Sequence, residues 1–149
     1  MSVAKGDRSE TSANLETAKV LKGLCVYTIQ ICKNEKNFPK RDRWILTQEI
    51  VKCAVKAYEK VTEANSITVV TMDDYIMRRK CQVKARKKLK AMLALVEIAH
   101  MVLSLEESRV EYWTGCIRGS LNLLTKWRAS DRKRYAKQLK GETTGKPVK

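Results

Sequence analysis

The chain has 149 residues, of which 44% are hydrophobic and 32% charged, a composition typical of a single globular domain and not of a disordered chain. With six glycines and two prolines it can form few turns, which favours a small number of long helices. The longest apolar segment, residues 91–103, is too short to span a bilayer and is interrupted by Glu97 and His100. We therefore expect no membrane-spanning helix and no membrane partner.

Two short segments carry the whole net charge. Residues 78–90 hold eight Lys and Arg and no acidic residue, and residues 126–149 hold nine against Asp131 and Glu142. Their charges of +8 and +7 equal the formal +15 of the chain. Basic side chains held together repel one another unless an anion offsets them, which favours a polyanionic partner such as nucleic acid. A solvated, solubilising face and an anionic membrane surface are the alternatives.

The periodicity of the apolar residues predicts two helices in the first half of the chain. The first runs from about Asn14 to Glu35. Its apolar face consists of Leu21, Leu24, Cys25, Thr28, Ile31 and Cys32. Residues 34–40 interrupt the pattern, and Pro39 suits the start of a second helix over residues 40–64.

The second helix carries two apolar stripes on nearly opposite sides. The first stripe consists of Leu46, Ile50, Cys53, Ala54, Ala57, Val61 and Ala64. The second consists of Trp44, Val51, Val55 and Tyr58. A helix in a small monomeric bundle needs one buried stripe, so the second stripe predicts contact with another subunit. A central helix packed on both sides within one chain is the alternative.

A third helix is expected over residues 72–103, after a connection at residues 65–71. Thr71 and Asp74 predict a capping box at its start. Its second half is so apolar that we expect it to be buried nearly all round. The stripe along the helix consists of Cys81, Ala85, Leu89, Met92, Leu93, Val96, Ala99 and Leu103.

Ser104 and Glu107 predict a further capping box, at the start of a fourth helix. The seam of that helix consists of Val110, Trp113, Ile117, Ser120, Leu124 and Trp127. The helical pattern can continue to Leu139, with Gly141 as a stop. Four helices with short connections predict an all-α, up-down antiparallel four-helix bundle.

We assign residues 14–130 to the bundle, residues 1–13 to a disordered N-terminal arm, and residues 131–149 to a basic, partly disordered tail. Because the seam ends at Trp127, we expect the tail to be dispensable for the fold. The first fourteen residues contain no apolar run, so we expect no secretory signal there. A cytoplasmic location is therefore expected.

Catalytic and metal-binding patterns are scarce. The five cysteines are scattered singly, which is neither a disulfide framework nor a zinc pattern. His100 has only Glu97 at helical spacing, and that single Glu-x-x-His lacks the partner carboxylates of a di-iron bundle. There is no glycine-rich phosphate loop. We expect no cofactor, no metal and no enzymatic activity.

The candidate site is therefore a binding surface made of basic residues from the two charged segments. It consists of Arg79, Lys80, Lys84, Arg86, Lys87, Lys88, Lys90, Arg128, Arg132, Lys133 and Arg134. Guanidinium groups suit bidentate phosphate contacts. Tyr75 and Tyr135 are the nearest aromatics for base stacking, while Trp127 is expected in the core. Contacts should therefore go mainly to backbone phosphates.

Three segments, taken together, resemble the accessory variability determinant (Avd) family of diversity-generating retroelements. They are FPKRDRWILTQEI at residues 38–50, RKKLKAMLALVEIAH at residues 86–100, and SLEESRVEYWTGCIRGSLNLLTKWRAS at residues 104–130. The resemblance covers about residues 18–130. The family's fourth helix usually closes with Gly-Gly-Trp, where this chain has Thr125-Lys126-Trp127.

This resemblance implies a four-helix bundle that assembles as a homopentameric barrel. It also implies binding to a reverse transcriptase and to structured template RNA, with DNA or an RNA–DNA hybrid as related polyanions. Proteins of this family are non-catalytic partners in mutagenic cDNA synthesis. The related bundles encoded in ribosomal-RNA intervening sequences, whose role is undefined, are one alternative, and a structural or membrane-surface basic bundle is another.

Overall fold

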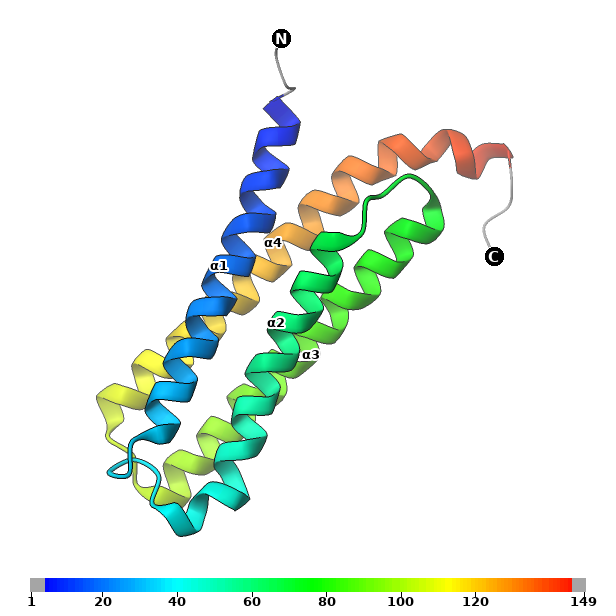
Figure 1. Ribbon diagram of the computed structural model, residues 1–149. Helices are drawn as coiled ribbons and strands as arrows, with labels where there is room; N and C mark the ends of the chain where they lie inside the picture. The colour runs from blue at the N-terminus through cyan, green and yellow to red at the C-terminus, as the bar shows by residue number, and fades with distance from the viewer. Residues whose placement is uncertain (1–4, 146–149) are drawn as a thin grey trace.

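The computed structural model describes the backbone of residues 5–145 and the side chains of residues 13–41 and 45–137. Its long helices are α1 (Lys5–Lys33), α2 (Gln48–Ser66), α3 (Met72–Leu103) and α4 (Glu107–Gly145). They alternate in direction, and each lies against its two neighbours in the order α1, α2, α3, α4, with α4 returning to α1 (Figure 1). The predicted all-α, four-helix bundle is confirmed.

The core lies along the predicted seams. All six stripe residues of α1 and all six seam residues of α4 are buried. Trp113 is fully buried, and its indole N–H donates to the Thr28 hydroxyl at 3.2 Å. Phe38, in the connection after α1, packs edge-on against Trp113 and closes that end of the core. All five cysteines are free thiols, and three of them, Cys25, Cys32 and Cys53, are buried.

The start of α2 differs from the prediction of one helix from Lys40. A short 3₁₀-helix, Lys40–Asp42, and a π-helical turn, Arg43–Thr47, precede the regular helix at Gln48. The first predicted stripe of α2 is confirmed, since all seven of its residues are buried. The 3₁₀ and π turns before Gln48 therefore do not change which face of α2 is buried.

Helix α3 has the predicted bounds and the predicted cap. The Thr71 hydroxyl accepts from the Asp74 backbone N–H at 3.2 Å, and Asp74 accepts from that of Thr71 at 3.0 Å. The expected burial of its second half is wrong, because Met101 is 83% exposed and Ile98 and Val102 are also exposed. One face of that half packs into the bundle, and the other remains open in the single chain.

The expected capping box at Ser104 is also wrong. Ser104 adopts a left-handed conformation, φ 51°, and ends α3 instead of starting α4. This conformation is common just after a helix because it turns the chain away from the helix axis. Helix α4 then begins at Glu107.

Two helices extend beyond their predicted bounds. Helix α1 begins at Lys5, within the predicted N-terminal arm, and α4 continues to Gly145, within the predicted tail. Asp131 and Tyr135 are buried, so the core extends past Ser130. Within the described range, no helix is long and apolar enough to cross a membrane.

Candidate nucleic-acid interface

Arginines from α3 and α4 converge on a hollow between the two helices. On α3, Arg79 lies four residues after Tyr75 and seven before Arg86, so these side chains share one face. On α4, Arg128 and Arg132 lie one turn apart. The hollow, here called the arginine hollow, has a volume of about 220 Å³. It is lined by Tyr75, Arg79, Gln82, Thr125, Arg128, Ala129 and Arg132.

Neighbouring arginines affect the pKa of Arg128. Partial burial lowers the pKa of Arg128, and the positive charges of Arg79, Arg86 and Arg132 lower it further. Within the part of the chain that the structure describes, none of the four arginines pairs with a carboxylate. The Nε atom of Arg128 is buried and has no hydrogen-bond acceptor in the described chain. The hollow is thus an uncompensated positive site that favours an anion.

A buried ion pair forms the floor beneath the hollow. Arg78 donates from Nε to Oδ2 of Asp131 at 2.8 Å and from a terminal nitrogen to Oδ1 at 2.9 Å. Gln82, which lines the hollow, donates to the same Oδ2 at 2.8 Å. Arg78 also reaches the Asn14 side chain and the Ile67 carbonyl. This network joins α1, α3, α4 and the α2–α3 connection.

Aromatic rings pack around the Arg78 guanidinium. It lies 5.2 Å from the centre of the Trp127 ring and 5.6 Å from that of Tyr135. Trp127 is fully buried, as predicted, and Tyr135 is also buried and thus unavailable for base stacking. Tyr75 is half-buried, lines the hollow, and lies 5.8 Å from the Tyr135 ring. Of the predicted stacking residues, Tyr75 alone lies at the site.

The remaining predicted basic residues do not gather at the hollow. The positive charge of Lys84 lowers the pKa of Glu63 on α2, and that of Lys88 lowers the pKa of Cys53 on α2, so these two lysines act toward α2. Arg134 lies against the Tyr135 ring. Lys80, Lys87, Lys90 and Lys133 are exposed. The predicted set therefore divides into a convergent α3–α4 group, an α2-facing group, outward lysines, and Arg134 beside Tyr135.

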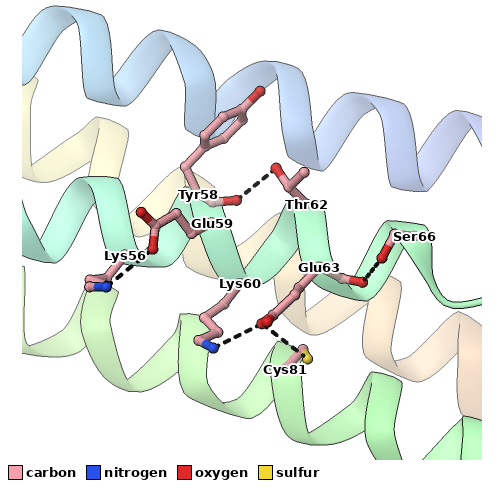
Figure 2. A network of polar contacts seen from close by, with 8 residues as sticks. All are labelled: Lys56, Tyr58, Glu59, Lys60, Thr62, Glu63, Ser66 and Cys81. Atoms are coloured by element: carbon pink, nitrogen blue, oxygen red, sulfur yellow. Dashed lines mark hydrogen bonds and ion pairs between the residues drawn. The ribbon is translucent and has the colours of Figure 1, made fainter.

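The interface between α2 and α3 holds a polar network around Cys81 (Figure 2). Lys60 donates to Glu63 at 2.8 Å, and the Cys81 thiol donates to the same carboxylate oxygen at 3.6 Å. Burial, followed by the Glu63 charge, raises the pKa of Cys81, so this thiol is not an activated nucleophile. Among the described residues, no three metal-ligating side chains are grouped together.

An open apolar groove lies along the outer side of α2. It has a volume of about 650 Å³, and Val51 and Val55 from the second predicted stripe form part of it. Lys40, Thr47, Gln48, Lys52 and Lys56 complete its lining. Tyr58 is half-buried and lines an adjacent hollow with Glu59 and Lys60, while the Trp44 side chain lies outside the described residues.

Comparison with known protein families, with curated proteins and with solved structures finds no match to this chain. The site is therefore interpreted from its own residues. Sequence reasoning placed the four arginines at the surface but missed the ion pair beneath them. The sequence did contain a signal for this pair. Asp131 lies four residues after Trp127, and Tyr135 four residues after Asp131, so both continue the helical spacing of the buried seam.

Proposed function

We propose that this protein is a non-catalytic, RNA-binding accessory protein that holds structured RNA on the α3–α4 face. The convergence of Arg79, Arg86, Arg128 and Arg132 without a carboxylate partner carries this proposal. Guanidinium groups donate in pairs to phosphate oxygens, and a site without acidic neighbours gains most from such an anion. Only Tyr75 is placed for stacking, so shape and phosphate contacts dominate over base recognition.

The partner enzyme in this proposal is the reverse transcriptase of a diversity-generating retroelement, and the protein acts with it in the cytoplasm as a homo-oligomer, a pentamer. The resemblance of residues 38–50, 86–100 and 104–130 to the accessory variability determinant family supports this part. The open apolar groove at Val51 and Val55 supports assembly. A reverse-transcriptase gene next to this one, with a template repeat and a variable repeat nearby, is the expected genomic setting.

The test of RNA binding compares two double variants that lose the same charge. Arg79→Gln/Arg86→Gln removes two groups of the convergent cluster, and Lys84→Gln/Lys88→Gln removes two lysines near α2. Fluorescence anisotropy with a structured RNA should show affinity falling roughly tenfold or more between about 50 and 200 mM salt for the unaltered protein. The arginine variant should lose at least about tenfold in affinity, and the lysine variant less.

Each other outcome contradicts part of the proposal. Equal losses would mean that net charge, and not the α3–α4 face, governs binding. An unaltered protein without salt-dependent RNA affinity would favour a purely structural bundle. Thermal melting of both variants shows whether an affinity loss reflects unfolding.

A further inference from the structure

We propose that the arginine hollow binds the terminal phosphomonoester of a nucleic-acid strand. This inference rests on the proposed RNA-binding function and specifies the chemical group that the hollow takes. The outward lysines Lys80, Lys87 and Lys133 are exposed and suit the diester phosphates of the strand. The hollow differs from them because it is concave and three arginines, Arg79, Arg128 and Arg132, line it together.

The first argument is the density of charge. Three guanidinium groups line the hollow, and the charge of Arg86 also reaches Arg128. A phosphomonoester carries about −1.5 to −2 charge near neutral pH and three terminal oxygens. An internal diester carries a single charge and two such oxygens. The monoester therefore offsets more of the repulsion among these arginines and offers an acceptor to each lining guanidinium.

The second argument is an unsatisfied donor. Nε of Arg128 is buried at the hollow without an acceptor among the described residues. Buried donors in proteins are almost always hydrogen-bonded, since leaving one unpaired costs its full desolvation. Arg128 lines the hollow, so a rotation of its side chain would bring this donor to an oxyanion bound there.

The third argument is the shape of the surroundings. The floor is rigid, because Gln82 is fixed by its hydrogen bond to Asp131, which is itself held by Arg78. A preformed anion site loses little entropy on binding. Tyr75 forms part of the wall, and its ring can stack on the base next to a bound terminal phosphate. A volume of about 220 Å³ admits a phosphate with part of its sugar but not a duplex.

The experiment uses one hairpin RNA with single-stranded ends in three forms: both ends hydroxyl, a 5′-phosphate, and a 3′-phosphate. Fluorescence anisotropy with the full-length protein should show roughly tenfold tighter binding of at least one phosphorylated form, equivalent to one additional strong contact. The two phosphorylated arms identify which strand end the hollow takes. A nucleoside monophosphate with its phosphate at the preferred position, 5′ or 3′, should compete with the RNA and abolish the gain in affinity.

Two variants and one control locate the effect. Arg128→Gln and Arg132→Gln should each remove the preference for the phosphorylated end, while Lys133→Gln, the exposed neighbour of Arg132, should keep it. Arg132 is exposed, so its variant guards against a folding defect at Arg128. Equal affinity for all three RNAs, or loss of the preference in Lys133→Gln, overturns this inference and leaves the proposed function standing. Absence of binding to every form overturns both.

Discussion

The Arg78–Asp131 pair illustrates how a charged residue can be part of a core. Arg78 is 4% exposed and Asp131 is 1% exposed, so both charges are removed from water. Two hydrogen bonds between them, a third from Gln82, and the rings of Trp127 and Tyr135 surround the pair. Desolvation of two ions is costly, and complete pairing of this kind is what makes it tolerable.

Removal of the Asp131 charge should therefore be strongly destabilising. In Asp131→Asn the Arg78 charge stays buried without a counter-ion, and the new amide nitrogen faces donors from Arg78 and Gln82. We expect a loss of about 3–5 kcal/mol in the free energy of unfolding, measured by urea denaturation. The control is Glu111→Gln, an exposed carboxylate on α4, which should change stability by less than about 0.5 kcal/mol. Similar unfolding midpoints for the two variants would contradict this interpretation of the pair.

Residue-scale prediction from sequence succeeded where hydropathy and periodicity agreed. The stripe of α1 and the seam of α4 are buried as predicted, because apolar residues at spacings of three and four share one helix face. Arg78 and Asp131 were missed because hydropathy assigns charged residues to the surface. Their contact also spans 53 positions, and local sequence cannot show which distant residues meet.

At the scale of helices, α4 gives the clearest difference between sequence and structure. The last predicted seam residue is Trp127, yet Asp131 and Tyr135 continue the buried face for two more turns. Residues 131–137 are thus a structural part of the bundle as well as a source of positive charge. They also position Arg132 at the hollow. The burial of Asp131 and Tyr135 argues against the expectation that the tail is dispensable for the fold, which truncation tests.

Two truncations should separate these roles. A chain ending at Ser130 loses the Asp131 carboxylate and the Tyr135 ring, so Arg78 is left buried and unpaired. We expect destabilisation at least as large as that of Asp131→Asn, about 3–5 kcal/mol or more, in urea denaturation. A chain ending at Lys137 keeps these contacts and should retain nearly full stability. If the chain ending at Ser130 unfolded at the same urea concentration as the full protein, the core would end at Trp127 after all.

The two capping predictions show what local sequence can and cannot determine. The capping box at Thr71 and Asp74 forms because α2 has already ended at Ser66, so Thr71 is not needed to end another helix. The pattern at Ser104 and Glu107 is equally good locally, but Ser104 is needed to end α3. The tight turn between α3 and α4 therefore decides the conformation. Competition of this kind becomes visible only when the two helices are packed together.

The two ends of the bundle (Figure 1) carry different sets of side chains. Helix α3 starts, and α4 ends, at the extremity that carries the arginine hollow. The opposite extremity, where α2 starts and α3 ends, exposes Ile45, Met101 and Val102. The α2 groove lies along the side of the bundle. Val70 and Met77, which lie close in sequence to Tyr75 and Arg79 of the hollow, are also exposed, so apolar surface is present at both ends of the bundle.

The open groove on α2 predicts that the protein forms an oligomer. Val51 and Val55 line an open groove on α2, and the single chain leaves both of them only half-buried. Light scattering should give a mass for the unaltered protein that is a multiple of 17.1 kDa, five-fold if the family resemblance holds. Val51→Glu/Val55→Glu should dissociate the assembly to single chains, because a carboxylate buried in an apolar interface lacks a counter-ion.

The matched control for that variant is Val70→Glu, which introduces a carboxylate at an exposed valine in the α2–α3 connection, outside the groove. It should leave the mass unchanged. Circular dichroism should show full helical content in both variants, since neither Val51 nor Val55 is among the fully buried core residues. A single-chain mass for the unaltered protein at micromolar concentration would refute assembly. An unchanged oligomer in Val51→Glu/Val55→Glu would instead place the subunit contact on another face, and the second stripe of α2 would then be ordinary solvent-exposed surface.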